Sequence, residues 1–478
     1  MVWTKTEYNE KLMAAVLPMK HFWHNRFHIE MPFGLINDPN GLSFYQGEYH
    51  IFYQWNPYSC EHKNKSWGYI KTTDFVHYTI PSLALEPGES FDKDGCYTGC
   101  GFVEDEQLQF VYTGNVKNNQ NERESYQCLG SLQSDGTIKK EGILIAKQPS
   151  GYTAHFRDPY IFYRAGEQYM VLGIQTEALK GRVVLYHKNA ETWEFSGEIK
   201  TNLGDFGYMW ECPNMLRFAD VDVLIFSPQG LKAQETKWQN LYQTGYIAGD
   251  LNLSTLEFRH GDFVEVDMGF DFYAPQVFEA NGRHLMLGWI GMPDRSEDYP
   301  TNEEGWMFAL TMMRELTMKN GRLYQQPIHE MKKLRGDKTE ISRRDFTNYT
   351  CELPRGSEIL LDLVLGEAKQ IKLEFCFALE KITFSYDRQK ELFCIDRNEM
   401  KLGGKGIRKF KLAAETNLRL HFFIDRTVIE LFCQDGEKTA TFMYFPEADC
   451  SLKLVIHSDD IITSVQGSIW QMGCIEYK

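Results

Sequence analysis

Short apolar runs with the period of a β-strand recur through the first two-thirds of the chain, and helical periodicity is scarce after the first twenty residues. Gly, Pro or Asn ends these runs, as is typical of strands joined by turns. Five runs resemble one another at intervals of 54–61 residues, with centres at Phe52, Val111, Val171, Ile225 and Met286. A repeat of that length can hold four strands and their turns, which form one propeller blade. The pattern therefore predicts an all-β fold with a five-bladed β-propeller, and the alternative is a chance spacing of buried strands.

A short polar motif precedes the centre of each run by 13 or 14 residues. The five motifs are NDPNG around Asp38, CYTGC around Thr98, FRDP around Asp158, WECPN around Glu211 and DFYAPQ around Tyr273. The constant distance gives every motif an equivalent position in its blade. If that position lies on the strand nearest the propeller axis, we expect Asp38, Asp158 and Glu211 to line a single pocket.

The pattern changes after residue 330, where QQPIHEMKKLRG predicts the end of a strand followed by a brief helical connector. From about residue 340 apolar and polar residues alternate, and turns at intervals of roughly 8–12 residues are typical of a β-sandwich. We therefore expect a helical extension over 1–20, the propeller over 21–335 and a C-terminal sandwich over 340–478. The sandwich carries no evident chemistry, and Asp425 and Glu430 alternate with apolar residues as on a solvated strand face.

Composition and charge narrow the possible partners and the compartment. The formal net charge of −15 argues against nucleic acid or an anionic membrane as the main partner. No apolar run approaches the roughly 18 residues that cross a bilayer, and the amino terminus lacks the features of a signal peptide. The 11 cysteines are scattered without a C-x-x-C pair, which favours free thiols over disulfides or a zinc site. We therefore expect a cytoplasmic protein.

Each of the three carboxylates has an ordinary structural explanation when it is taken alone. Asp38 lies in a good turn sequence, Asp158 follows an arginine with which it could pair, and Glu211 could end a strand. Three carboxylates in one pocket are harder to explain structurally, because like charges destabilise the fold. Two carboxylates that flank a bond are what glycoside hydrolysis requires. The aromatic residues that could stack on a sugar, some of which must be core, are Trp55, Trp67, Tyr97, Tyr273 and Trp289.

No metal or cofactor is expected, because the carboxylates lack the histidine partners or the loop spacing of a metal site.

The motifs, in their order along the chain, resemble those of glycoside hydrolase family 32. They are NDPNG, FYQWNP, FRDP, WECPN, GWIG and ELT before QQPI, and they extend over nearly the whole chain. Further stretches are most similar to the bacterial intracellular members that act on sucrose 6-phosphate: FDKDGCYTG, YTGNV, TAHFRDP, DFGYMWECP and GFDFYAPQ. The resemblance implies a five-bladed propeller followed by a β-sandwich, in agreement with the repeat.

The resemblance also implies roles for individual residues. Asp38 matches the nucleophile, Glu211 the acid/base, and Asp158 the carboxylate that binds fructose hydroxyls and stabilises the transition state. The implied reaction is a double displacement with retention that releases fructose, so the pocket should raise the pKa of Glu211 relative to that of Asp38. The positions that match sugar contacts are Asn37, Gln54, Trp67, Tyr97, Thr98, Arg157 and Trp289, and Tyr273 is a further candidate.

The sequence departs from the family pattern at several places. Ile36 precedes Asn37, and Tyr97-Thr98-Gly99-Cys100 replaces the usual aromatic–Ser-Gly-Ser. His62 stands where many invertases carry a tryptophan that serves the leaving group, and the segment supplies His62, Lys63 and Lys65.

These cations could hold the phosphate of sucrose 6-phosphate, or they could belong to a solvated loop. The alternatives are an invertase or fructan hydrolase acting on sucrose or short fructo-oligosaccharides, and a catalytically silent sugar-binding propeller. Intact Asp38, Asp158 and Glu211 argue against the silent protein, because binding alone needs no nucleophile beside an acid.

Overall fold

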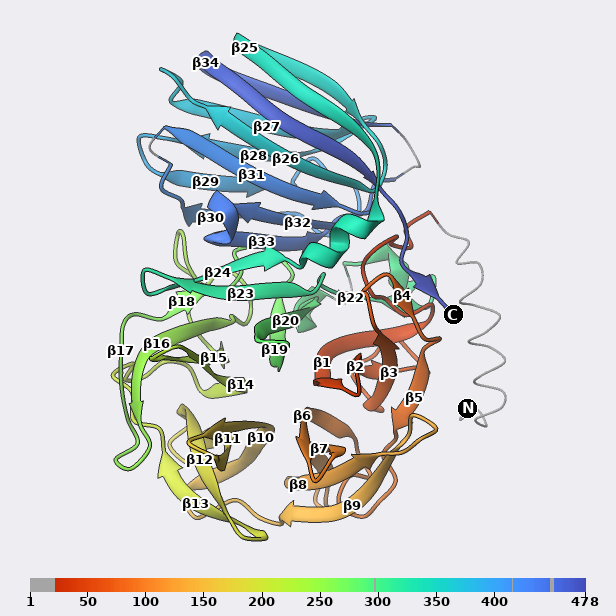
Figure 1. Ribbon diagram of the computed structural model, residues 1–478, viewed down its shortest axis with the longest axis vertical. Helices are drawn as coiled ribbons and strands as arrows, with labels where there is room; N and C mark the ends of the chain where they lie inside the picture. The colour runs from red at the N-terminus through yellow and green to blue at the C-terminus, as the bar shows by residue number, and fades with distance from the viewer. Residues whose placement is uncertain (1–21, 296–297, 415, 448–450) are drawn as a thin grey trace.

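The computed structural model describes residues 22–295, 298–414, 416–447 and 451–478, and the helical extension predicted over 1–20 lies outside them. Its described elements are 35 β-strands and four short 3-10 helices, so the prediction of an all-β chain is confirmed (Figure 1). None of the helices in these ranges has the length and apolar character needed to cross a bilayer. The sheets of residues 34–327 form a propeller-like arrangement, and a sheet-rich C-terminal domain packs against one side of it.

Five separate sheets account for residues 34–327. The first contains β1 (Gly34–Tyr45), β2 (Glu48–Asn56), β3 (Ser66–Thr72), β4 (His77–Tyr78) and β5 (Ser82–Leu85), joined by β21 (Trp306–Met307) and β35 (Glu476–Tyr477). The second contains β6 (Cys96–Glu104), β7 (Gln107–Lys117), β8 (Arg123–Leu132) and β9 (Ile138–Ile145). The third contains β10 (Tyr152–Arg164), β11 (Glu167–Thr176), β12 (Gly181–Asn189) and β13 (Thr192–Glu198).

The last two sheets follow the same plan. The fourth contains β14 (Met209–Phe218), β15 (Val221–Gln229), β16 (Gly245–Asn252), β17 (Glu257–His260) and β18 (Val264–Glu265). The fifth contains β19 (Tyr273–Ala280), β20 (Arg283–Ile290), β22 (Ala309–Leu310), β23 (Arg314–Lys319) and β24 (Arg322–Pro327). The 3-10 helices η1 (Pro293–Arg295) and η2 (Pro300–Asn302) lie between β20 and β21.

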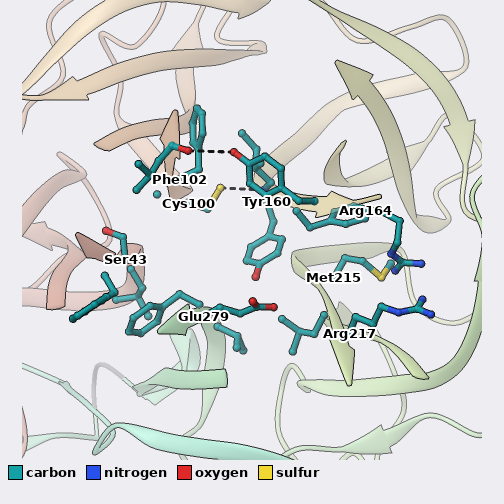
Figure 2. Close-up of a pocket in the computed structure, with 18 residues that line it drawn as sticks. Ser43, Cys100, Phe102, Tyr160, Arg164, Met215, Arg217 and Glu279 are labelled. Carbon is teal, nitrogen blue, oxygen red and sulfur yellow. Dashed lines mark hydrogen bonds between the residues drawn. The ribbon is translucent and has the colours of Figure 1, made fainter. Parts of the chain in front are cut away.

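The first strands of the five sheets form a closed ring. Each contacts the next in the order β1, β6, β10, β14 and β19, and β19 contacts β1 again. The ring also closes through β21, whose Trp306 pairs with Gly34 of β1 in parallel. Figure 2 shows residues of all five strands around a central cavity: Ser43, Cys100, Tyr160, Met215 and Glu279. The first strand of each sheet therefore lines the axis.

Every first strand has an irregular register at its polar motif. The pairing with the second strand slips between Ile36 and Pro39 in β1, and the same slip recurs at Cys96/Gly99, Arg157/Tyr160, Glu211/Asn214 and Tyr273/Gln276. Three of the slips carry a non-glycine residue in the left-handed region, namely Asp158, Cys212 and Ala274. A bulge bends a strand and re-aims its side chains. The repeated motifs are thus repeated bulges at the same place in each sheet.

One ten-stranded sheet forms the C-terminal domain, and it is connected to the fifth sheet by η3 (His329–Leu334). Its two long strands are β25 (Arg335–Leu353) and β34 (Leu452–Met472), and the first part of β34 pairs with β27 while its last part pairs with β26. The other members are β26 (Ser357–Val364), β27 (Gln370–Phe377), β28 (Glu380–Asp387), β29 (Leu392–Asp396), β30 (Ile407–Lys411), β31 (Asn417–Ile424), β32 (Val428–Cys433) and β33 (Lys438–Met443). The short helix η4 (Gln434–Gly436) connects β32 to β33.

The two halves of this sheet share one hydrophobic core. The ring of Phe422 on β31 lies 5.0 Å from that of Phe375 on β27 and 5.1 Å from that of Phe384 on β28. The domain therefore buries its apolar faces against each other.

The prediction of a solvated face at Asp425 and Glu430 is wrong. Both side chains are fully buried where the C-terminal domain meets the propeller-like part. His28 donates a hydrogen bond to each of the two carboxylates, and Arg314 of β23 forms an ion pair with Glu430. The alternation of polar and apolar residues predicts which strand face carries these two residues, but it does not indicate that the other domain covers that face.

Candidate active site

The three carboxylates singled out by the repeat line one pocket. Asp38 comes from β1, Asp158 from β10 and Glu211 from β14, and each stands at the bulge of its strand. Thr98 of β6 and Tyr273 of β19 complete the ring, so the first strands of all five sheets contribute to the site. Asp158 and Asp38 lie in electrostatic range of each other and of Glu211.

Asp38 is held by two short side-chain hydrogen bonds. The Thr98 hydroxyl donates to its Oδ2 over 2.6 Å, and Asn37 Nδ2 donates to its Oδ1 over 2.9 Å. Burial raises the pKa of Asp38, and the nearby Lys65 ammonium opposes this rise. The carboxylate is therefore oriented on both oxygens.

Glu211 has a different set of partners. Arg157 donates to its Oε1 through Nε over 2.9 Å and through Nη2 over 2.6 Å. Tyr273 Oη and Gln229 Nε2 each donate to its Oε2 over 2.6 Å. Burial alone would raise the pKa of Glu211, but Arg157 and these hydrogen bonds hold it below its ordinary value.

Asp158 carries the most strained backbone of the three. It has a φ of 63°, a left-handed conformation that a non-glycine residue rarely adopts. Its Oδ2 accepts the Cys212 backbone amide over 2.9 Å and lies 4.0 Å from Arg157 Nε. Burial raises the pKa of Asp158 to about 7, Arg157 opposes this, and the charge of Glu211 adds to it.

The expectation that the pocket raises the pKa of Glu211 relative to that of Asp38 is wrong for this arrangement. The pKa of Asp38 is raised, whereas that of Glu211 is lowered. The physical reason is the placement of Arg157, whose guanidinium contacts Glu211 directly. A proton in this pocket therefore prefers Asp158 or Asp38 to Glu211.

Most of the predicted sugar-contacting residues line the pocket, and they are Asn37, Gln54, Tyr97, Thr98, Arg157, Tyr273 and Trp289. Trp289 Nε1 is buried without a hydrogen-bond partner among the described residues.

Trp67 is the exception among the sugar-binding candidates. It is fully buried behind the pocket, and its Nε1 donates to the Tyr97 carbonyl over 3.1 Å. Trp55 is buried in the same way and donates to the Phe33 carbonyl. Neither indole is free to bind a sugar, because each is buried and its N–H group donates to a backbone carbonyl.

The basic segment predicted to hold a phosphate divides into three different environments. The Lys63 side chain is 69% exposed, lies outside the pocket and pairs with Glu61. His62 lines the pocket against Trp289, and burial together with Lys65 lowers its pKa to about 3, so the ring is neutral. Lys65 lines the pocket, but its ammonium donates to Gln54 Oε1 over 2.9 Å and to Asn37 Oδ1 over 3.3 Å. The segment therefore offers no exposed cationic pair to the pocket.

Sequence reasoning missed Arg123, Gln229 and Tyr242 in the pocket lining. Gln229 ends β15 much as Gln54 stands near the end of β2, so a polar residue at the end of a repeat's second strand was an available signal. Arg123 stands in a run of charged residues that reads as an exposed turn, and nothing in the sequence marked it.

The described side chains contain no group of three or more His, Cys, Asp or Glu residues that could hold a metal ion.

Two family models cover nearly the whole chain. The N-terminal domain model of glycosyl hydrolases family 32 matches residues 28–327, and the C-terminal domain model of the same family matches residues 330–471. A sucrose-6-phosphate hydrolase of Bacillus subtilis is 39% identical over 431 residues, which are 88% of each chain.

Solved structures show the same likeness. The structure of a sucrose-6-phosphate hydrolase from Lactobacillus gasseri matches with a TM-score of 0.89 and 30% identity, over 99% of this chain and 100% of that one. A family 32 β-fructofuranosidase of Bombyx mori matches with a TM-score of 0.86 and 28% identity, over 99% of each chain. The chain therefore belongs to glycosyl hydrolase family 32 and is a glycoside hydrolase of the β-fructofuranosidase type.

Proposed function

We propose that this protein hydrolyses the fructosyl bond of sucrose 6-phosphate by double displacement, with Asp38 as nucleophile, Glu211 as acid/base and Asp158 as transition-state stabiliser. The observation that carries the proposal is a single pocket in which Asp38, Asp158 and Glu211 meet, and in which Asp38 and Glu211 have separate hydrogen-bond partners. Two carboxylates in different environments are what a retaining glycosidase needs. The sucrose-6-phosphate hydrolases among its relatives support the substrate.

In the first step an oxygen of Asp38 attacks the anomeric C2 of fructose. The bond from C2 to the glycosidic oxygen breaks, and that oxygen takes the proton of Glu211, so glucose 6-phosphate leaves. Thr98 and Asn37 fix the orientation of the Asp38 carboxylate before the reaction, so less conformational entropy is lost when it attacks. The Asp158 charge stabilises the oxocarbenium-like transition state.

In the second step water attacks C2 while Glu211 takes its proton, and the bond between Asp38 and C2 breaks. Fructose leaves, and Glu211 is protonated again as the cycle requires. Glu211 starts the first step protonated, but its contacts with Arg157 favour the ionised form. We infer that bound sugar draws Arg157 away from Glu211, which raises the pKa of that carboxyl group when catalysis needs it.

The domain assignment belongs to the same proposal. We count the five sheets as five propeller blades over 21–335, and the closed ring of first strands supports that count. We assign the C-terminal sheet to a β-sandwich over 340–478, supported by the shared core of its two halves.

The proposal predicts retention at C2, with the carboxyl groups of Asp38 and Glu211 about 5–5.5 Å apart when substrate is bound. Incubation with sucrose 6-phosphate, followed by proton NMR before mutarotation, should show β-fructofuranose as the first product. The same assay with sucrose tests the alternative of an enzyme for unphosphorylated sugars. A first product of α-configuration would exclude double displacement, and no release of fructose from either sugar would exclude the function.

The raised pKa of Asp158 predicts a fall of activity on the acid side. Because this pKa is about 7, Asp158 binds a proton below that pH and loses the charge that stabilises the transition state. We therefore expect kcat/KM, which reports the free enzyme, to rise with pH through about 7. Asp158→Asn should lower the rate and remove this limb of the profile. A profile that stays flat from about pH 5.5 to 8, where such a group would titrate, would contradict this reading.

A further inference from the structure

We propose that Arg123, which lies over the Tyr97 ring at the wall of the pocket, binds the phosphate on the leaving half of the substrate. The inference rests on the proposed function and adds to it the residue that selects the phosphorylated sugar. Arg123 begins β8 of the second sheet and lines the same pocket as the three carboxylates. Its guanidinium lies 5.5 Å from the centre of the Tyr97 ring.

Among the cations that line the pocket in the described part of the chain, Arg123 is the one without a carboxylate or hydrogen-bond partner on its side chain. Arg157 donates through Nε and Nη2 to Glu211 and through Nη1 to His155, while Lys65 donates to Gln54 and Asn37. By contrast, no carboxylate among the described residues forms an ion pair with Arg123, whose side chain is half-buried. Withdrawing an unpaired charge from water has a cost that an anionic ligand would offset.

The geometry of the contact with Tyr97 suits an anion. A cation–π contact with the ring helps to hold the guanidinium without using its N–H groups as hydrogen-bond donors. Those donors form a planar fork that matches two oxygens of a phosphate. A sugar hydroxyl could accept one of them, but it would leave the charge uncompensated.

Arg123 also lies on the appropriate side of the site. Its charge acts on Glu211 and Asp158, whereas the charge of Lys65 acts most strongly on Asp38 and less on the other two carboxylates. The general acid contacts the glycosidic oxygen, so the leaving sugar extends from the side of Glu211. A phosphate on that sugar would lie among the groups around Arg123. The chain's net charge of −15 makes such a local cation necessary for binding a sugar phosphate.

The test compares kcat/KM for sucrose 6-phosphate with that for sucrose in four proteins: the wild type, Arg123→Gln, Arg123→Lys and Lys63→Gln. Arg123→Gln should lower the ratio of the two values roughly ten- to a hundred-fold, because one charge-assisted contact is lost. Arg123→Lys should give an intermediate ratio, since it keeps the charge without the fork. Lys63→Gln is the matched control, and its ratio should equal that of the wild type because Lys63 is exposed and pairs with Glu61.

A second readout measures binding without turnover, by competitive inhibition with glucose 6-phosphate and with glucose. Arg123→Gln should weaken inhibition by glucose 6-phosphate and change inhibition by glucose far less. If Arg123→Gln lowers kcat/KM equally for sucrose 6-phosphate and for sucrose, Arg123 binds the sugar rather than its phosphate, and the inference is overturned. If the wild type cleaves sucrose as well as sucrose 6-phosphate, phosphate recognition fails although the fructosidase proposal stands. If it cleaves neither, the proposed function fails first.

Discussion

Replacement of Asp38 by Ala, or of Glu211 by Gln, is expected to lower kcat by roughly 10³-fold or more while the protein stays folded. Without Asp38 no covalent intermediate forms, and without a proton from Glu211 the sugar leaves as an alkoxide. Either change also removes one of three mutually repelling carboxylates, so we expect no loss of fold. The measurement is the initial rate of fructose release, with circular dichroism to verify folding.

The two variants should differ in how they respond to the leaving group. A fructoside with a nitrophenol leaving group needs little protonation, so Glu211→Gln should recover much of its rate on it while Asp38→Ala should not. Glu279→Gln is a suitable control. Glu279 also lies on a first strand, β19, but it lines a different cavity from the pocket of the three carboxylates (Figure 2). Turnover near the normal rate by folded Asp38→Ala would remove Asp38 from the mechanism.

The location of the site could be predicted from the sequence because it depends on a repeated local feature. Each polar motif precedes a buried strand by nearly the same distance, and the structure shows a bulge at every one of them. Repeats carry such information because equivalent positions in successive blades face the same axis. This constant spacing is sufficient to predict that Asp38, Asp158 and Glu211 share one pocket.

The contacts around the site could not be predicted, because a residue's type does not reveal its partners. Trp67 supports the pocket from behind, Lys63 points to solvent, and Arg123 enters the pocket from a stretch that reads as an exposed turn. The order of pKa values depends in the same way on Arg157, which could have paired with its neighbour Asp158 but contacts Glu211 more closely.

The largest effect on stability is expected at the buried charges between the two parts of the molecule. His28 lies 2.9 Å from Asp425 Oδ2 through Nδ1 and 3.0 Å from Glu430 Oε1 through Nε2, and all three side chains are excluded from water. Burial would lower the pKa of His28, but its hydrogen bonds to Asp425 and Glu430 raise it to about 9. An imidazolium that is hydrogen-bonded to two carboxylates therefore joins the segment before β1 to the C-terminal domain.

The sign of the pH dependence follows from this rise. Since the folded pKa of about 9 exceeds the ordinary value of 6.5, the proton stabilises the folded state. The contribution is complete below about pH 6.5 and is lost as the pH rises through about 9, and it amounts to roughly 3 kcal/mol in the free energy of unfolding. Denaturant titrations at pH values across this range, followed by tryptophan fluorescence, should show the loss.

His28→Asn removes the titrating group, so its stability should be lower at neutral pH and should change much less between about pH 6.5 and 9. His329→Asn provides the matched control, because that ring is 71% exposed and a substitution there should leave the wild-type dependence intact. The buried carboxylates give the experiment a further consequence. Without the imidazolium, Glu430 keeps Arg314 and the Met312 amide as partners, but the charge of Asp425 loses its cation, so the buried carboxylates are left partly uncompensated. If wild type and His28→Asn lose stability in parallel as the pH rises, the proton resides elsewhere and His28 is only a neutral hydrogen-bonding spacer between the domains.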